Sequence, residues 1–82
     1  MQEDGSVGGT IRAIRLKLRL SQSGFARRAG VSQSVVSRIE NGVQPVKRKL
    51  LDSVAKVISR EQYIIVRDAA NRDCVERSLR NA

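Results

Sequence analysis

Residues 21–42 read SQSGFARRAGVSQSVVSRIENG, and they contain the same helix-start pattern twice. Ser21 and Ser32 are each a candidate N-cap, since a Ser side chain accepts a hydrogen bond from a free N–H of the first turn. Each Ser follows one apolar residue and precedes another at the fourth helical position, which is the hydrophobic-staple arrangement. These apolar residues are Leu20 and Phe25 in the first copy and Val31 and Val36 in the second. The stretch predicts two short helices that the chain enters in the same way.

One glycine separates these two predicted helices, and an Asn-Gly pair follows the second. Gly30 can adopt the left-handed conformation that ends a helix and turns the chain sharply. Ala26 has a small side chain, which lets the two helix backbones approach closely. The pattern therefore predicts a helix-turn-helix whose two helices pack at a steep angle.

These residues resemble the lambda-repressor and Cro-like helix-turn-helix proteins, also called the xenobiotic-response-element family of bacterial and phage regulators. The resemblance covers roughly residues 10–58, and it implies an all-α fold: a compact bundle of four to five helices that binds DNA. The residues that carry it are Leu20-Ser21-Gln22, Phe25-Ala26, Gly30-Val31-Ser32, Val36-Ser37-Arg38-Ile39 and Glu40-Asn41-Gly42. One departure is Gly24, which stands where the family usually has the glutamate of a capping box.

The positive charge of the chain is concentrated in the same segment. The 82 residues include 16 Lys and Arg against 8 Asp and Glu, a formal net charge of +8. Residues 10–60 hold twelve of the basic residues and two of the acidic ones, so this segment carries +10. A basic domain favours polyanions such as DNA. A single domain of this size buries little surface, so we also expect a partner subunit.

Two other polyanionic partners fit the composition less well. Membrane insertion needs about 20 consecutive apolar residues, and the chain has no such run. Proteins that bind single-stranded nucleic acid stack bases on aromatic side chains, and the only two here are Phe25, assigned to the core, and Tyr63. Double-stranded DNA is the expected partner.

The sequence offers no residues for catalysis or for a metal site. Cys74 is the only cysteine and there is no His, which excludes an internal disulfide and a cysteine-based zinc site. No catalytic constellation and no phosphate-cradling glycine loop is recognisable. We expect a protein that is not an enzyme, that uses no cofactor and, without a signal-type segment, that works in the cytoplasm.

The first nine residues are polar, with three glycines and two acidic residues, which predicts a flexible, passive N-terminal tail over residues 1–9. Thr10 is a candidate N-cap for a helix that runs to about Arg19. Its apolar face would hold Ile11, Ile14 and Leu18. Arg15 falls on that inward face and needs a partner, which the family resemblance implies is Glu40. Two separate solvated charges remain the alternative.

Beyond the motif, Pro45 is suited to the first turn of a fourth helix. The residues that would close the core from this helix are Leu50, Leu51, Val54, Ala55 and Ile58. The DNA-binding domain is expected to span residues 10–60, with a dimerisation segment over residues 61–82.

The structure of that last segment stays open at the sequence level. Residues 59–62 form a candidate capping box for a fifth helix, whereas the run that follows is rich in β-forming residues and fits a short strand. That run, Tyr63, Ile64, Ile65 and Val66, is predicted to make a dimer contact, and packing against the fourth helix is the alternative. Val75 and Leu79 would extend the apolar surface if the segment is helical.

In a helix-turn-helix the second helix lies in the major groove, with its N-terminal residues against base edges. The predicted base-reading residues are Gln33, Ser34, Ser37 and Arg38. Gln can pair with adenine, Arg with guanine, and Ser with several bases. The predicted phosphate-binding residues are Gln22, Ser32, Asn41, Lys47 and Arg48, of which Gln22 is assigned from the family resemblance.

These observations predict a sequence-specific regulator of transcription, in the form of a repressor that binds an inverted-repeat operator as a homodimer. The alternative is an antitoxin that binds a protein partner, a toxin, through its C-terminal segment and regulates its own operon through the same motif.

Overall fold

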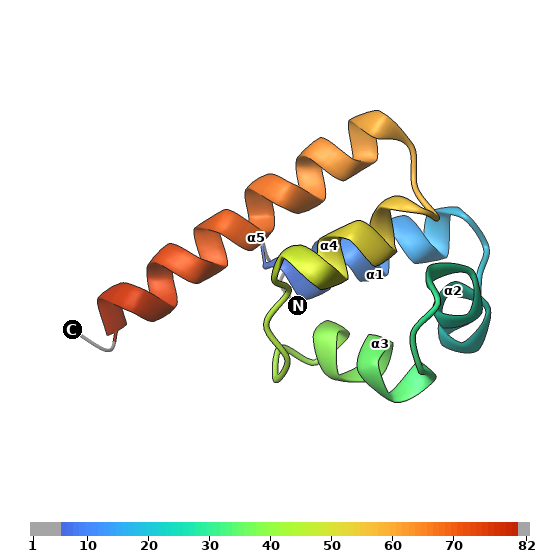
Figure 1. The fold of residues 1–82 in the computed structure, drawn as a ribbon, viewed down its shortest axis with the longest axis horizontal. Helices are drawn as coiled ribbons and strands as arrows, with labels where there is room; N and C mark the ends of the chain where they lie inside the picture. The colour runs from blue at the N-terminus through green and yellow to red at the C-terminus, as the bar shows by residue number, and fades with distance from the viewer. Residues whose placement is uncertain (1–5, 81–82) are drawn as a thin grey trace.

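The computed structural model describes residues 6–80, with side chains as far as Asp73. This part of the chain is all-helical, as predicted, and the strand alternative for residues 63–66 is wrong (Figure 1). The helices are α1 (Val7–Lys17), α2 (Gln22–Ala29), α3 (Gln33–Glu40), α4 (Arg48–Ala55) and α5 (Arg60–Arg80). α1 packs against α3 and α5, α2 against α3 and α4, and α4 against α5.

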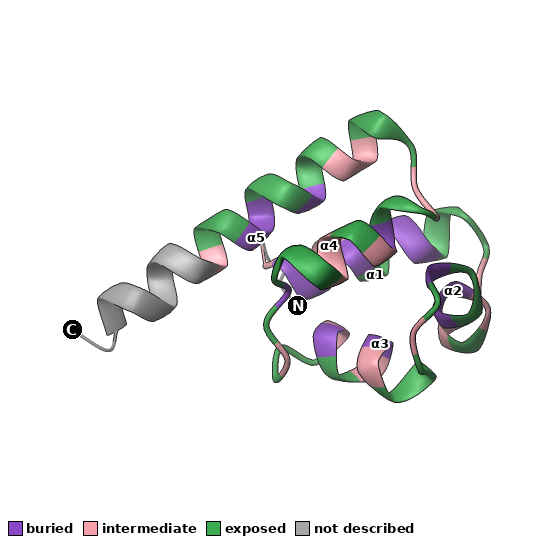
Figure 2. Cartoon of the chain, in the orientation of Figure 1, coloured by how far each residue is buried: buried purple, intermediate pink, exposed green. Residues whose placement is uncertain are grey.

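The core takes side chains from every helix (Figure 2). The largest fully buried ones are Ile11 from α1, Phe25 from α2, Val36 from α3 and Val66 from α5. Val54 from α4 is 3% exposed. Burying each such side chain contributes about 1.5–3 kcal/mol, so apolar contacts to α1 and α4 hold the helix-turn-helix, and α5 packs in turn on α1 and α4.

α1 begins earlier than the sequence predicted. Ser6 is the N-cap instead of Thr10, and its Oγ accepts a hydrogen bond from a backbone N–H of the first turn at 3.0 Å. Val7 is 3% exposed and belongs to the core, so the helix extends far enough to bury it. The tail predicted for residues 1–9 is therefore wrong for residues 7–9, and residues 1–5 lie outside the described part.

A glycine explains why that first turn can pack so closely. A Cβ built on Gly8 would overlap the carbonyl oxygen of Ile39 and would lie 3.3 Å from the Cα of Glu40. The start of α1 thus crosses the end of α3 at backbone contact. Packing therefore requires glycine at position 8. From the sequence, a glycine within a polar stretch predicts a flexible tail instead.

α4, in contrast, begins later in the chain than the sequence predicted. Lys47 is its N-cap, so Pro45 lies in the loop and not in the first turn of the helix. Val46 is only 8% exposed, and its burial anchors the loop before the helix starts. Of the predicted apolar face, Val54 is buried and Leu50, Leu51 and Ile58 are partly buried, whereas Ala55 is exposed.

The capping box predicted at the start of α5 is present. Ser59 Oγ accepts the backbone N–H of Gln62 at 3.1 Å, and Gln62 Oε1 accepts the backbone N–H of Ser59 at 3.0 Å. Two backbone donors that the helix leaves unpaired are therefore satisfied reciprocally. Local side-chain chemistry starts a helix here in spite of the β-forming residues that follow.

The apolar run at the start of α5 divides between the core and the surface. Val66 is fully buried within the same chain, so its predicted dimer contact is wrong: one face of α5 packs on α1 and α4. Tyr63 is half-buried. Ile64 and Ile65 are 43% and 55% exposed and remain available to a partner. The side chains of Cys74, Val75 and Leu79 lie outside the described ones.

Candidate nucleic-acid interface

The α2–turn–α3 unit is built by local interactions of the predicted kind. Ser21 Oγ accepts the N–H of Gly24 at 2.9 Å, and Ser32 Oγ accepts the N–H of Val35 at 3.2 Å. Gly30 has φ 78° and ends α2 in the left-handed conformation. These caps fix where α3 starts, and therefore which of its residues point outward.

α3 has a buried face and an exposed polar face. Val36 and Ile39 are 2% and 3% exposed and hold the helix to the core. Gln33, Ser34 and Arg38 are exposed, and Ser37 is partly so. Since residues three and four apart share one side of a helix, the four predicted base-reading residues lie on one outward surface.

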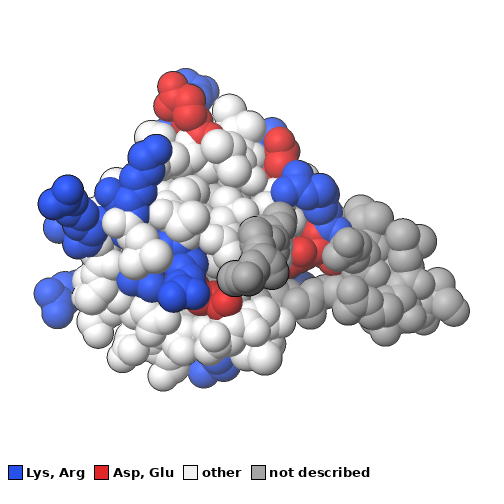
Figure 3. Space-filling model, turned by 180° about the vertical axis from the view of Figure 1, so that it is seen from behind, with Lys and Arg blue, Asp and Glu red and all other residues white. Residues whose placement is uncertain are grey.

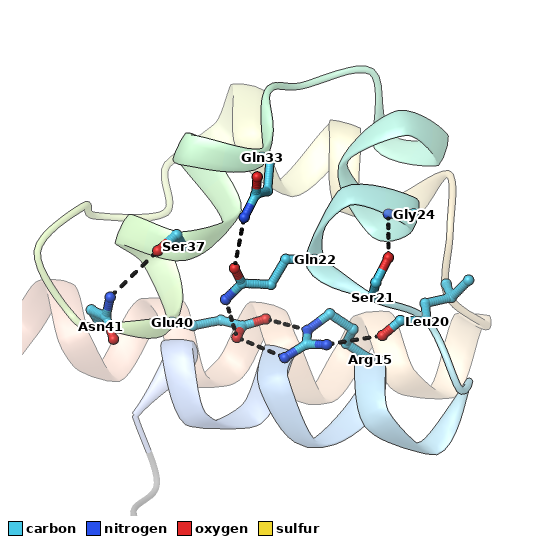
Figure 4. A network of polar contacts seen from close by, with 9 residues as sticks. All are labelled: Arg15, Leu20, Ser21, Gln22, Gly24, Gln33, Ser37, Glu40 and Asn41. Carbon is cyan, nitrogen blue, oxygen red and sulfur yellow. Dashed lines mark hydrogen bonds and ion pairs between the residues drawn. The ribbon is translucent and has the colours of Figure 1, made fainter.

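A buried ion pair lies beneath this surface (Figure 4). Arg15 Nε donates to Glu40 Oε2 at 2.7 Å and Arg15 Nη2 donates to Glu40 Oε1 at 3.1 Å, a bidentate pair. The two side chains are 9% and 4% exposed. Arg15 Nη1 donates to the carbonyl oxygen of Leu20 at 2.9 Å, in the loop before α2. The ion pair predicted between Arg15 and Glu40 is therefore present, and it joins α1, α3 and the loop that leads into α2.

Gln22 extends this pair to the surface (Figure 4). Its Nε2 donates to Glu40 Oε1 at 3.1 Å, and its Oε1 accepts from Gln33 Nε2 at 3.2 Å. Because the carboxylate of Glu40 accepts from the amide nitrogen of Gln22, the amide oxygen of Gln22 is the atom that faces Gln33. The amide of Gln33, the first residue of α3, is thereby oriented, and it keeps an acceptor oxygen and a second N–H that this bond does not use.

The other predicted phosphate-binding residues come just before α3 and after it in the chain. Asn41, Lys47 and Arg48 are exposed at the end of α3 and at the start of α4, and Ser32 is exposed at the start of α3. Asn41 Nδ2 lies 3.5 Å from Ser37 Oγ. Ser32 and Asn41 thus lie at the two ends of α3, and Lys47 and Arg48 lie beyond the loop that follows it.

Charge is distributed around α3 more than on it. Arg38 is the single basic residue of α3. On the face seen in Figure 3, basic side chains gather toward the side of α2, while the lower part, over α3, is mostly uncharged. Exposed basic residues of α1 and α2 include Arg12, Lys17, Arg27 and Arg28. The exposed surface of α3 therefore offers mostly neutral hydrogen-bonding groups, which suit base edges.

Gln44 is a residue near the site that the sequence analysis did not identify. Its Oε1 accepts from Arg38 Nε at 3.1 Å. The contact depends on the turn after α3, where Gly42 has φ 78° and sends the chain back toward Arg38. The Asn-Gly pair signals such a turn, but the residue type at position 44 carries no signal of its own.

The described part of the chain holds neither a cluster of metal-ligating side chains nor a membrane-spanning helix. Among the residues that the structure describes, no group of three or more His, Cys, Asp or Glu side chains could hold a metal ion. Within the same residues, no helix has both the length and the apolar character that crossing a bilayer requires.

Comparison with known proteins agrees with this geometry. A family model described as helix-turn-helix matches residues 11–60, a segment that contains most of α1 and all of α2, α3 and α4. Searches of curated proteins and of solved structures found no match. The chain belongs to the lambda-repressor and Cro-like helix-turn-helix family, whose members are sequence-specific DNA-binding regulators of transcription.

Proposed function

We propose that this protein is a repressor that binds an inverted-repeat DNA operator as a homodimer, with α3 in the major groove. The observation that carries the proposal is the outward polar surface of α3, above a buried framework that fixes its orientation. Repression requires occupancy alone, because a protein seated on an operator that overlaps a promoter excludes the polymerase.

The base contacts would come from the exposed surface of α3. The amide of Gln33 offers an acceptor and a donor to an adenine, and Arg38 offers paired donors to a guanine. Ser34 and Ser37 can donate or accept, so they suit several bases. Each good bidentate contact contributes about 1–3 kcal/mol of discrimination.

The phosphate contacts would position α3 in the groove. Lys47 and Arg48 supply charge, and Ser32 and Asn41 supply polar groups at the two ends of α3. Gln22 adjoins the N-terminus of α2, where the helix dipole also attracts a phosphate. Contacts of this kind make binding fall steeply as salt rises.

The dimer contact would use the exposed part of α5. Ile64 and Ile65 protrude, and Ile65 also lines an open groove of about 390 Å³ between α1 and α5. The other residues that line this groove are Gly9, Thr10, Ala13, Ile14, Lys17 and Gln62. Exposed apolar surface beside a groove favours burial against another protein surface. The alternative function, an antitoxin, would place a toxin on this surface in place of a second copy.

Selection of bound sequences from a pool of random duplexes tests the proposal. The expected consensus is an inverted repeat whose half-sites are centred about 34 Å apart, one turn of DNA. A consensus made of one unrepeated half-site would contradict the homodimer, and recovery of no consensus would contradict sequence-specific binding.

A further inference from the structure

The loop after α3 closes back on Arg38 through both backbone and side-chain contacts. The backbone N–H of Val43 donates to the carbonyl oxygen of Arg38 at 3.0 Å, and that of Gln44 donates to the same oxygen at 3.3 Å. The side chain of Gln44 is half-buried, and its Oε1 accepts from Arg38 Nε at 3.1 Å. Gln44 is therefore anchored at its backbone and partly enclosed at its side chain, while Arg38 is exposed.

This contact restricts the guanidinium group without neutralising it. Arg38 has five N–H donors in a planar fork, and the bond from Nε to Gln44 leaves the two terminal nitrogens to other acceptors. A carboxylate at position 44 would cancel the positive charge, whereas an amide oxygen holds the plane and leaves the charge for DNA. Holding a long side chain before binding removes part of the entropy that binding would otherwise cost.

We propose that Gln44 is a specificity-determining residue: it positions Arg38 so that the two terminal nitrogens of the guanidinium read a guanine. The inference rests on the proposed function, because it assumes that α3 faces base edges. Gln44 acts through Arg38 and is a positioning residue. Its removal reduces discrimination at the one base pair that Arg38 reads and leaves the other positions unchanged.

The experiment first identifies that base pair as the position whose preference is lost in Arg38→Ala. Wild-type protein should discriminate there by about 5- to 150-fold, the range that corresponds to a bidentate contact. Gln44→Ala and the similarly sized Gln44→Met should each lower this ratio at least about threefold. Neither should change the ratio in an Arg38→Ala background, because no guanidinium is left to position.

Two further variants separate positioning from a general effect on folding. Val43→Ala changes a neighbouring side chain that is 68% exposed and keeps the backbone bonds to Arg38, so its discrimination ratio should equal that of the wild type. Gln44→Glu keeps an acceptor for Arg38 Nε but cancels the charge of the guanidinium, so it should bind all duplexes more weakly at low salt, since its carboxylate also repels phosphates.

The inference is overturned if Gln44→Ala and Gln44→Met keep the wild-type ratio. It is also overturned if they lower discrimination equally at every position together with the melting temperature, since that is the result of a merely structural role. A wild-type protein that discriminates at no position would overturn the proposed function and this inference with it. Loss of the ratio at the Arg38 position alone, with unchanged melting temperature, supports both.

Discussion

At the scale of single residues, the exposed surface of α3 is connected to the interior. Gln33 is exposed, yet it is two hydrogen bonds away from the carboxylate of Glu40, through Gln22. Glu40 in turn holds the buried guanidinium of Arg15. Glu40 therefore contributes both to the stability of the fold and to the orientation of Gln33.

Removal of this acid should destabilise the fold strongly. Glu40→Leu leaves the guanidinium of Arg15 buried without its acceptor, and an uncompensated buried charge costs about 3–5 kcal/mol. The double variant Arg15→Met/Glu40→Leu removes both charges, so it should lose markedly less stability than Glu40→Leu does. Urea unfolding of both variants measures the difference. If the free energy of unfolding of Glu40→Leu were within about 0.5 kcal/mol of the wild-type value, burying Arg15 without Glu40 would carry no such cost.

Some of these residues could be predicted from sequence because their roles are local. Ser21 and Ser32 cap helices through N–H groups three residues away. The role of Gln22 between Glu40 and Gln33 could not be predicted from local rules, because its two partners lie 18 and 11 residues further along the chain. Its amide is oriented by the tertiary packing of α2 against α3.

At the scale of elements, α1, α2 and α3 end in the same way. In each, a residue one or two positions after the last helical residue has a positive φ, and the next N–H donates five residues back, as Leu20 does to the carbonyl of Arg15 at 3.1 Å. This is the Schellman arrangement, which favours glycine. Gly30 and Gly42 meet that preference, but Arg19 ends α1 with φ 61°.

Arg19→Gly should therefore stabilise the protein. A left-handed conformation costs a residue with a Cβ about 1–2 kcal/mol, and part of the gain is offset by the greater freedom of glycine in the unfolded chain. We expect an increase of up to about 1 kcal/mol in the free energy of unfolding. Gly30→Ala is the reverse change and should lose about 1 kcal/mol or more. Denaturant unfolding that shows Arg19→Gly to be destabilising would contradict this account of the α1 end.

The crossing of α1 and α3 gives a second prediction for the elements. Gly8→Ala pushes a methyl group into the carbonyl of Ile39 and should cost about 1–3 kcal/mol, as overpacking does. Gly24→Ala is the matched control, because its Cβ would meet Ser21 Oγ at 3.3 Å and no backbone atom. It should cost less stability than Gly8→Ala, because a serine hydroxyl can shift more easily than the backbone of Ile39. Equal shifts in the melting temperatures of Gly8→Ala and Gly24→Ala would contradict the close crossing of α1 and α3.

Element boundaries were predictable only where local chemistry sets them. The Ser59 and Gln62 capping box marks the start of α5 within the sequence itself. Gly8 and Pro45 gave wrong predictions for the starts of α1 and α4, because tertiary contacts decide the roles of these two residues. Gly8 lies in a helix that crosses another, and Pro45 lies in a loop held by the buried Val46.

At the scale of the whole molecule, the apolar run at the start of α5 is divided between the core and the exposed surface. Val66 is in the core and Ile64 and Ile65 are exposed. The sequence predicts that this run is buried, but it does not say against which surface. Only the position of α5 on α1 and α4 assigns Val66 to the core and leaves two isoleucines outside.

Self-association should depend on Ile65. Ile65→Asp places a charge in the apolar groove between α1 and α5 and should weaken the dimer at least about tenfold. Arg67→Asp introduces the same side chain about 200° away around the helix and should leave the dimer intact. Sedimentation velocity over a range of protein concentrations measures both. Equal self-association of Ile65→Asp and wild type would place the dimer contact elsewhere.

The central claim is that the exposed surface of α3 reads the sequence of double-stranded DNA. The most direct test is a fluorescence anisotropy titration, at physiological ionic strength, of a duplex with the selected consensus and of a scrambled duplex of the same composition. The account predicts that wild-type protein binds the consensus at least about 10³-fold more tightly, and that Gln33→Ala and Arg38→Ala lower this ratio more than they lower affinity for the scrambled duplex. Equal affinity for the two duplexes would contradict it.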